Sequence, residues 1–370
     1  MKILQMFGEP VSHGGQEAFV INMLTHMPSG GMTIDVLTPY YCDNEHYRDI
    51  VERRGGKLYC LGMKFEPGGS RLNLIAPLKK FLSGHGYDVI HIHSGSTSVL
   101  AEGARAAQSA GIKKIIVHSH CAAEKFTLRH AAVKFVMNAV MFGCPTHYAA
   151  CSLIAGQSKY PRRIVKRRLI ILKNGVDIQK FSFNAQMRSY MRGRLNIPEN
   201  AVVLGHVGRF SYQKNHEYLL SVLAAARTRG IDAKLMLIGS GENMQNVISL
   251  AQKLGLSQHV MFIGNVNNVN DYMQAMDVFL LPSRFEGLPI VGVEAQAVGL
   301  PCIFSSAVTN EVALTSNVCY LPADGASVGL WADKVLQFAD KWGADNTAAL
   351  KNAGFDVCRT ADILRDIYFS

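Results

Sequence analysis

The chain has 370 residues, of which 48% are hydrophobic and 18% charged, a composition that excludes a largely disordered protein. The length exceeds the roughly 250–300 residues at which one hydrophobic core stops growing, so two globular domains are expected. The net charge of +10 suits a phosphate-rich partner, whereas the absence of an apolar run of roughly 18 residues argues against a membrane span.

The charge is uneven along the chain. Six cations fall within one short stretch: Lys159, Arg162, Arg163, Lys166, Arg167 and Arg168. Such a cluster fits an anionic membrane surface, a pyrophosphate-linked lipid or a nucleic acid, and an ordinary solvated face explains it equally well. The eight cysteines show no metal-ligand spacing, and most, such as Cys302, lie in apolar runs. Buried, reduced thiols and a cytoplasmic location are therefore expected.

Short β-branched runs alternate with amphipathic stretches through the first half of the chain. The expected helices include 16–27, 72–83 and 97–110. The expected strands are Lys2–Phe7, Thr33–Thr38, Lys57–Leu61, Asp88–His93, Lys114–His118, Thr146–Cys151 and Leu169–Lys173.

The second half repeats this alternation. Its expected strands are Val202–Gly208, Lys234–Gly239, Val260–Gly264, Val278–Pro282, Cys302–Ser305 and Val318–Leu321. Near-continuous apolar strands between helices predict a parallel sheet covered on both faces, so the fold class is α/β with two Rossmann-like doubly wound domains. We place one domain at 1–176 and the other at 177–354, with a final helix at 355–370. The polar stretch Asn174–Asn200 is the expected linker.

Ligands of doubly wound sheets sit beyond the carboxyl ends of the strands, and residues 285–294, FEGLPIVGVE, occupy such a place. They follow an expected strand and open a helix that Gly299 and Pro301 should end. Backbone N–H groups near Gly287 and Leu288, together with the positive end of the helix, would face a diphosphate. Glu286 and Glu294 would then face a sugar and a ribose.

A second loop, residues 208–215, GRFSYQKN, also runs from a strand into a helix. Arg209 and Lys214 on this loop can neutralise a diphosphate without a metal ion, and the chain contains no D-x-D pair. We therefore expect neither a metal ion nor another cofactor.

Two weaker patterns lie in the first half. Gly14 and Gly15 follow the first strand, where glycine permits close approach of a phosphate or sugar. The pairs His91/His93 and His118/His120 lie at strand ends. Alternating histidines on a strand are interpreted as packing, with one group that faces the ligand, rather than as a metal site.

Together these residues resemble the retaining glycosyltransferases of family 4, also called group 1, in the exopolysaccharide and capsule branch. The resemblance rests on Gly14–Gly15, DVIHIH at 88–93, His120, Asn174–Asp177 and the two loops of the second half. It implies the GT-B fold, in which two facing domains hold the donor in the cleft between them. It also implies that the ending, Phe355 to Tyr368, crosses back onto the first domain.

The resemblance implies roles for individual residues. Arg209 and Lys214 would bind the donor diphosphate, Glu286 the transferred sugar and Glu294 the ribose, with Gly208, Gly287 and Leu288 beside them. His120 would contact the sugar near the reacting carbon. Two positions depart from the pattern, because Cys121–Ala122 stand where an acidic residue is often found nearby and Arg284 replaces an uncharged residue.

The expected activity is retaining transfer of a sugar from a nucleoside-diphosphate donor, with uridine the commonest nucleotide of the family, to a lipid-linked glycan. The enzyme would act in the cytoplasm or on the inner face of the cell membrane. A sugar-nucleotide epimerase or phosphorylase of the same fold remains an alternative. A basic module that binds membrane or nucleic acid is another, although no basic face interleaved with aromatic residues supports nucleic acid.

Overall fold

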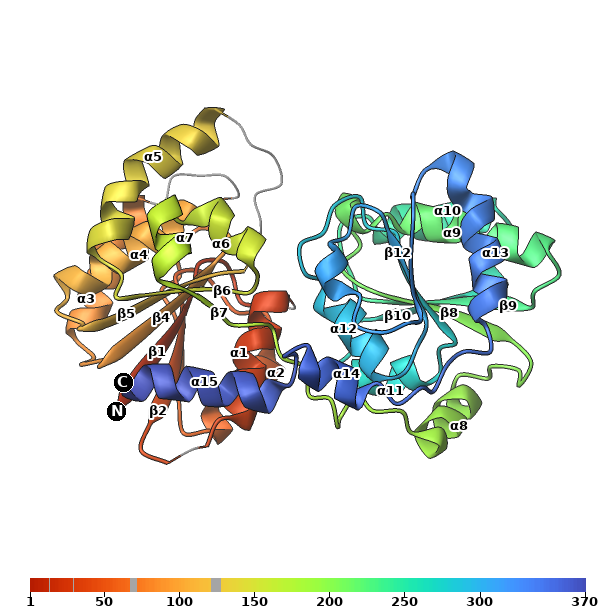
Figure 1. Ribbon diagram of the computed structural model, residues 1–370, viewed down its shortest axis with the longest axis horizontal. Coiled ribbons are helices and arrows are strands. Elements are labelled where there is room, and N and C mark those ends of the chain that lie inside the picture. The colour runs from red at the N-terminus through yellow and green to blue at the C-terminus, as the bar shows by residue number, and fades with distance from the viewer. Residues whose placement is uncertain (13, 29, 67–71, 121–127) are drawn as a thin grey trace. The chain divides into compact units, whose positions relative to one another are not determined.

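The computed structural model describes residues 1–12, 14–28, 30–66, 72–120 and 128–370, and the chain in it forms two compact units (Figure 1). Unit 1 comprises Met1–Gly175 and Asp356–Ser370, and unit 2 comprises Val176–Phe355. The sequence placed the corresponding limits at 176/177 and 354/355. His13 and the Cys121–Ala122 departure lie outside the described residues.

Unit 1 is built on a seven-stranded parallel sheet of order β3-β2-β1-β4-β5-β6-β7. Its strands are β1 Lys2–Phe7, β2 Thr33–Thr38, β3 Leu58–Cys60, β4 Val89–Ser94, β5 Lys114–Ser119, β6 His147–Ala150 and β7 Leu169–Ile171. The central strands β1, β4 and β5 are buried on both faces, as their mostly apolar sequences predict.

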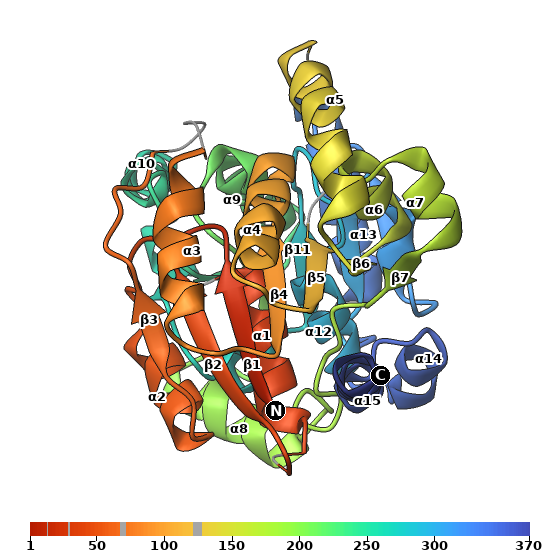
Figure 2. The same cartoon turned by 90° about the vertical axis from the view of Figure 1, so that its left-hand side faces the viewer.

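Helices cover both faces of this sheet (Figure 2). They are α1 Gly15–His26, α2 Glu45–Arg53, α3 Ile75–Ser83, α4 Thr97–Ser109, α5 Leu128–Gly143, α6 Leu153–Lys159, α7 Arg162–Arg167 and α15 Val357–Phe369, with the 3₁₀ turn η1 Leu72–Leu74. The C-terminal helix α15 packs beside α1, and its Val357, Leu364 and Tyr368 enter the same core as Phe19.

Unit 2 has a six-stranded parallel sheet of order β10-β9-β8-β11-β12-β13. Its strands are β8 Val202–Val207, β9 Ala233–Ile238, β10 Val260–Gly264, β11 Val278–Leu281, β12 Cys302–Ser305 and β13 Val318–Leu321. Its helices are α8 Ala185–Arg194, α9 His216–Thr228, α10 Met244–Lys253, α11 Val269–Gln274, α12 Ile290–Ala297, α13 Val328–Phe338 and α14 Thr347–Asn352, and its 3₁₀ turns are η2 Tyr212–Lys214, η3 Ser257–His259, η4 Asn310–Val312 and η5 Gly325–Ser327.

The predicted α/β class and the two doubly wound sheets are confirmed, and each predicted strand corresponds to an observed one. The end of α12 is also as expected, because Gly299 follows it with φ +83°. The cysteine prediction is wrong in part. Among the described cysteines Cys151 and Cys302 are buried, whereas Cys60 and Cys358 are exposed.

The prediction that 174–200 is a linker is also wrong. Most of this stretch belongs to unit 2, contains α8, and places Ile178, Phe181 and Met191 in the core of that unit. In the sequence this stretch shows few apolar residues that would attach it to a core. Part of its attachment comes instead from a salt bridge, whose residues look like ordinary polar surface residues. Arg188 of α8 is buried against the carboxylate of Asp277, and Arg192 donates to the same group at 3.1 Å.

The passage from unit 1 to unit 2 depends on a glycine. A Cβ atom at Gly175 would lie 2.6 Å from the Cα atom of Val357 at the start of α15. Asn22 of α1 donates to the Gly175 carbonyl at 3.0 Å, and the Thr360 hydroxyl donates to the Lys173 carbonyl at 3.3 Å. The start of α15 is thus held by close backbone contact against the segment that leads from β7 into unit 2.

We expect Gly175→Ala to lower the free energy of unfolding of unit 1 by about 1–3 kcal/mol, because the added methyl group forces two backbones apart. Gly143→Ala is the matched control, since a Cβ atom at the last residue of α5 meets nothing within 4 Å. Urea denaturation of both variants measures the difference. Equal stability of the two would contradict the close contact with α15.

Candidate active site

Two loops meet at the carboxyl edge of the unit 2 sheet. One follows β8 and contains η2, and the other follows β11 and leads into α12. Since β8 and β11 are neighbours in a parallel sheet, both loops emerge at the same edge although they lie 72 residues apart in sequence. This edge holds all the candidate residues of the second half of the chain.

An ion pair joins the two loops. Lys214 Nζ lies 2.6 Å from Glu286 Oε2, and both side chains are mostly buried, with 15% and 14% of their surfaces exposed. The Ser283 hydroxyl donates to the same oxygen at 3.1 Å, and Gln213 Nε2 donates to Glu286 Oε1 at 3.2 Å. The carboxylate is therefore fixed in position, and two of the predicted residues are brought into direct contact.

Arg284 also connects the two loops. Its guanidinium donates to Asn215 Oδ1 at 2.7 Å and to the Tyr212 carbonyl at 3.1 Å, and it lies over the Tyr212 ring at 4.4 Å. Asn215 has the left-handed backbone conformation, φ 58°, and donates to the Pro282 carbonyl at 3.3 Å. Arg284 therefore fastens one loop to the other.

The start of α12 offers free donors. Among the described residues, the backbone N–H groups of Gly287, Leu288 and Ile290 donate no hydrogen bond within the protein. Pro289 is the N-cap of α12 and not its first helical residue, and no side chain caps the helix. These groups and the helix dipole favour an anion at this end of α12.

Arg209 is held differently from Lys214. Its guanidinium lies 3.1 Å from Glu242, and both side chains are open to solvent, 72% and 61% exposed. An exposed pair of this kind is worth about 0–1 kcal/mol, so Arg209 can turn to another anion at little cost. Gly208 lies beside Lys214, where a Cβ atom would approach His206 Nε2 to 3.1 Å and Lys214 Cδ to 3.3 Å.

Glu294 lies half-buried in the second turn of α12. Burial raises the pKa of its carboxyl to about 7, and the positive charge of Lys180 offsets part of this effect. The carboxyl therefore exchanges its proton near neutral pH, unlike an ordinary surface acid.

In unit 1, Gly14 is the N-cap of α1 and Gly15 its first residue. A Cβ atom at Gly14 would lie 2.6 Å from Glu17 Oε2, whereas one at Gly15 would meet nothing within 4 Å. Glu17 Oε1 accepts a hydrogen bond from the Ser12 amide at 3.2 Å. A carboxyl thus already lies beside this glycine loop, and a bound phosphate would have to share the space with it.

His120 directly follows β5 and also belongs to unit 1. Its Nε2 atom lies 2.9 Å from His93 Nδ1, and the Phe19 ring packs against it with centroids 5.4 Å apart. Burial lowers the pKa of His120 to about 3, so the imidazole is neutral at physiological pH. It can take part in hydrogen bonds but cannot supply a positive charge.

Sequence reasoning missed the residues that hold the candidates in position. Gln213 and Ser283 orient Glu286, Glu242 pairs with Arg209, and Glu17 lies beside Gly14. Gln213 and Ser283 stand within three residues of candidates on the same loops, which is the one signal that could have found them. Glu242 follows a different strand, so only the folded sheet brings it to Arg209.

Two family models match the chain and together cover most of it. The model described as "Glycosyltransferase Family 4" matches residues 13–180, and the model described as "Glycosyl transferases group 1" matches residues 187–354. The first match lies in unit 1 apart from its last residues, and the second lies in unit 2.

Individual relatives agree with this assignment. The chain is 29% identical to the "Putative glycosyltransferase EpsF" of Bacillus subtilis over 89% of this chain and 85% of the relative. It is 27% identical to the Escherichia coli "UDP-Gal:alpha-D-GlcNAc-diphosphoundecaprenol alpha-1,3-galactosyltransferase" over 79% of this chain and 77% of that protein. Among solved structures, Anabaena Alr3699/HepE in complex with UDP-glucose shares the fold, with a TM-score of 0.77, 20% identity and coverage of 99% and 98%.

We expect the raised pKa of Glu294 to make unit 2 less stable as the pH rises. The folded unit binds the proton more tightly than the ordinary pKa of 4.5 provides, so the stability it contributes is complete below about pH 4.5 and is lost as the pH passes through about 7. Glu294→Gln should remove this loss and gain stability relative to wild type between pH 5 and 8. Urea titrations at four pH values measure the free energy of unfolding of wild type and of Glu294→Gln. A variant of the exposed Glu199, Glu199→Gln, is the control. A constant difference between Glu294→Gln and wild type would refute the assignment.

Proposed function

The chain belongs to the family 4, or group 1, glycosyltransferases, which act from a nucleotide-sugar donor, and on that premise we propose its specific reaction. It transfers a hexose from a UDP-sugar, with retention at the anomeric carbon, to a hydroxyl of a growing lipid-linked polysaccharide. No metal ion takes part.

The observation that carries this proposal is the Lys214–Glu286 ion pair beneath the open start of α12. A donor diphosphate bound by the free amides of Gly287 and Leu288 would lie next to the ammonium group of Lys214. Once the ammonium group is drawn to the diphosphate, the Glu286 carboxylate becomes available to the sugar hydroxyls. Arg209 leaves its exposed partner Glu242 and completes the positive charge around the leaving group.

The relatives support the choice of donor and acceptor. The Escherichia coli protein is named for a UDP-galactose donor and a diphosphoundecaprenol-linked acceptor, and HepE was solved with UDP-glucose. A uracil nucleotide and a lipid-linked acceptor are the natural first candidates for this chain.

The reaction follows from these charges. The bond between the anomeric carbon and the diphosphate oxygen breaks, and its electron pair stays on the diphosphate, which Lys214, Arg209 and the helix end stabilise. The acceptor hydroxyl forms the new bond on the same face of the sugar, and its proton passes to a phosphate oxygen. No enzyme nucleophile is needed, and electrostatic stabilisation of the leaving group supplies most of the rate effect.

The remaining candidates have supporting roles in this scheme. Glu294 binds the ribose hydroxyls, Gly208 allows the loop to lie close to the diphosphate, and Gly14 and Gly15 leave room for the donor at α1. His120 contacts the sugar near the reacting carbon as a neutral imidazole. Apart from these contacts of Gly14, Gly15 and His120 with the donor, the proposal assigns the acceptor to the N-terminal unit and the nucleotide sugar to the C-terminal unit.

A donor screen tests the proposed reaction. Purified enzyme is given single UDP-, GDP- and dTDP-sugars with a short lipid-diphosphate-linked glycan, and released nucleoside diphosphate is measured. We expect acceptor-dependent release from a UDP-hexose that persists in excess EDTA. Lys214→Ala and Arg209→Ala should each lower turnover by about 10²–10³-fold, because each removes one donor to the leaving group.

Lys234→Ala is the matched control, a lysine of the same unit on β9 that contacts neither loop in the described structure. Near-normal turnover of both site variants would contradict the diphosphate assignment. Loss of activity in EDTA that Mn²⁺ or Mg²⁺ restores would show that a metal ion does neutralise the charge. Donor isomerisation without transfer would favour the epimerase alternative.

We further propose that unit 1 attaches to the anionic face of a membrane where such an acceptor is presented. Four exposed cations of α7, Arg162, Arg163, Lys166 and Arg167, line a surface hollow of about 450 Å³. Exposed apolar residues lie on the preceding helices, Phe135, Val136 and Phe142 on α5 and Leu153 and Ile154 on α6. No helix in the described part of the chain is long and apolar enough to cross a membrane, so this attachment would be to its surface.

Two of the six cations of the sequence cluster are left out of this surface, Lys159 because it is buried and the exposed Arg168 because its guanidinium already has partners. Lys159 is buried, with 7% of its surface exposed, which corrects the prediction that it faces the membrane. Arg168 donates to the Thr146 carbonyl at 2.9 Å and lies over the Tyr148 ring. The attachment surface is therefore the four cations of α7 and the apolar residues named above.

Each cation near an anionic surface contributes about 1 kcal/mol, so we expect wild type to sediment with anionic vesicles and not with neutral ones. Changing the four α7 cations together to Gln should abolish binding at low salt, and added salt should weaken the wild type steeply. The charge-matched control changes four other exposed cations of unit 1, Arg53, Lys79, Lys80 and Lys113, to Gln. Equal loss in both quadruple variants would reduce the effect to net charge.

A further inference from the structure

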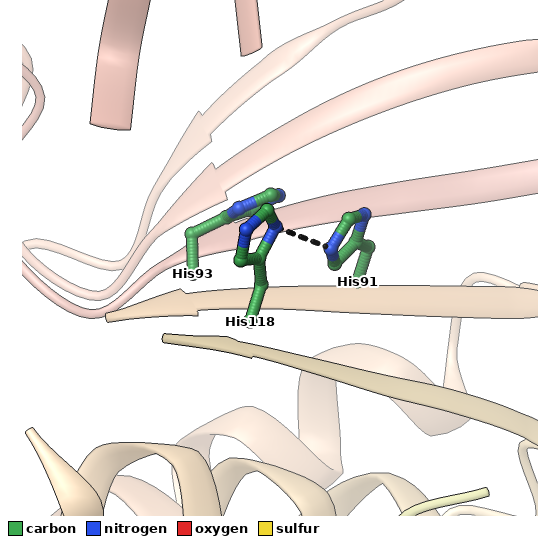
Figure 3. A group of neighbouring side chains, drawn as sticks. All are labelled: His91, His93 and His118. Atoms are coloured by element: carbon green, nitrogen blue, oxygen red, sulfur yellow. Dashed lines mark hydrogen bonds between the residues drawn. The ribbon is translucent and has the colours of Figure 1, made fainter. Parts of the chain in front are cut away.

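One hydrogen-bonded chain runs through the buried interior of unit 1. It links the four histidines at the ends of β4 and β5 with Gln5 of β1 and Tyr368 of α15, and Figure 3 shows three of the histidines. The contacts in order are His118 Nδ1 to His91 Nε2 at 3.2 Å, His91 Nδ1 to Tyr368 Oη at 2.9 Å, Tyr368 Oη to Gln5 Nε2 at 2.7 Å, Gln5 Oε1 to His93 Nε2 at 2.7 Å, and His93 Nδ1 to His120 Nε2 at 2.9 Å.

In this hydrogen-bonded chain, six of the eight imidazole nitrogens of the four histidines have a hydrogen-bond partner. His91, His93 and His118 place one nitrogen each within 4.8 Å of one another, which resembles a metal site. Both nitrogens of His91 and of His93 already have hydrogen-bond partners, however, and only His118 Nε2 and His120 Nδ1 are buried without one. A metal ion would have to break these bonds, so the geometry is that of a hydrogen-bonded chain.

All four imidazoles are neutral in this setting. Burial, reinforced by the neighbouring imidazoles, lowers the pKa of His91, His93 and His118 well below the ordinary value, and burial alone lowers that of His120. The Phe19 ring packs on His93, His118 and His120 with centroids 4.8–5.8 Å away. A neutral imidazole carries one N–H group, so its other nitrogen must accept.

With this restriction, the orientation of the Gln5 amide decides which nitrogen of each of the four histidines carries the proton. In this structure Gln5 Oε1 faces His93 and Gln5 Nε2 faces Tyr368. The Gln5 carbonyl oxygen can only accept, so His93 carries its proton on Nε2 and accepts at Nδ1 from His120 Nε2–H. The Gln5 NH₂ group donates to Tyr368, and among the described residues His91 Nδ1 is the one acceptor within reach of the buried Tyr368 hydroxyl proton, so we assign that proton to the bond with His91. His91 consequently donates from Nε2 to His118 Nδ1. All four histidines are then Nε2–H tautomers, and a flipped amide would make all four Nδ1–H.

We propose that Gln5 and Tyr368 are positioning residues that fix the tautomer of His120, leaving its free Nδ1 atom as a hydrogen-bond acceptor. This inference rests on the proposed place of His120 in the transfer reaction. In the proposed reaction the lone pair at Nδ1, which is buried without a partner in this structure, would accept a hydroxyl proton from the donor sugar or the acceptor. The opposite tautomer would present an N–H donor at this atom in place of an acceptor. The C-terminal helix α15 thereby sets the chemistry of a residue that its own backbone does not touch.

The arrangement gives Tyr368, the buried residue next to the end of α15, a role in the interior of unit 1. Tyr368 stands 363 residues from Gln5 in sequence, yet its hydroxyl is the only group between Gln5 and His91 among the described residues. Without it, the His91–His118 half would lose its connection to the His93–His120 half, and the Gln5 amide would be free to turn over.

Nitrogen-15 NMR of histidine-labelled enzyme tests the inference directly, because the two imidazole nitrogens report the tautomer. In wild type we expect all four histidines as neutral Nε2–H tautomers between pH 6 and 8. Assignment uses single His→Gln variants. A His120 Nδ1–H tautomer, or a mixture of tautomers among the four, would overturn the inference whatever the activity.

Tyr368→Phe should then give mixed tautomers at His120 and reduce kcat by about tenfold, as for other residues that orient a functional group, with little change in donor KM. Gln5→Met, which removes both amide contacts at similar volume, should do the same. Tyr160→Phe is the matched control, since this buried tyrosine of unit 1 donates only to backbone, to Val117 O at 3.0 Å and Ala149 O at 2.7 Å. It should lose stability but keep the four tautomers.

The outcomes separate the two levels of the proposal. Unchanged tautomers in Tyr368→Phe and Gln5→Met would overturn their positioning role. A kcat equal to that of Tyr160→Phe despite altered tautomers would overturn the link to the reaction. Full transfer activity of His120→Ala would instead show that His120 is not part of the proposed site. That result would contradict the proposed function, and the tautomer measurement would still test the roles of Gln5 and Tyr368.

Discussion

The parallel order of the strands is the constraint on which the junction of the two loops of unit 2 depends. Because β8 and β11 are neighbours and run the same way, the loops after them emerge together, and Lys214 reaches Glu286 across 72 residues of sequence. Charges this close must either pair or repel, and here they pair. The two loops are thus fastened to each other by an ion pair that only the folded sheet brings together.

The same constraint acts in unit 1 with the opposite electrostatic result. There β4 and β5 run side by side and place His91, His93, His118 and His120 at one edge, but burial keeps them uncharged. A group of cations would repel one another in this interior, whereas neutral imidazoles can donate and accept in sequence. At its strand ends one unit therefore holds a pair of opposite charges, and the other holds an ordered set of dipoles.

Much of this could be predicted from sequence because buried parallel strands have continuous apolar sequences, and strand ends mark where ligands bind. The two loops and His120 were selected as candidates in that way, and the structure does place them after strands of the two sheets. The linker 174–200 was misjudged because α8 is anchored by Arg188 and Asp277, and a buried ion pair looks like ordinary surface polarity in a sequence. Lys159 was also misjudged, because a lysine is usually exposed and its residue type does not show that the fold buries it.

The partners of the candidates were beyond the reach of sequence for a further physical reason. A hydrogen bond is specified by two atoms in space, and Gln5 and Tyr368 lie at opposite ends of the chain. Their pairing requires the crossing of α15 onto unit 1, which in turn requires the close backbone approach at Gly175. Because Gly175 lacks a Cβ atom, α15 can pack at this place on unit 1. In our proposal, this packing puts Tyr368 where it helps to decide which nitrogen of His120 carries the proton. Residue types alone indicate which groups can react, while the fold decides in which protonation state each one is presented.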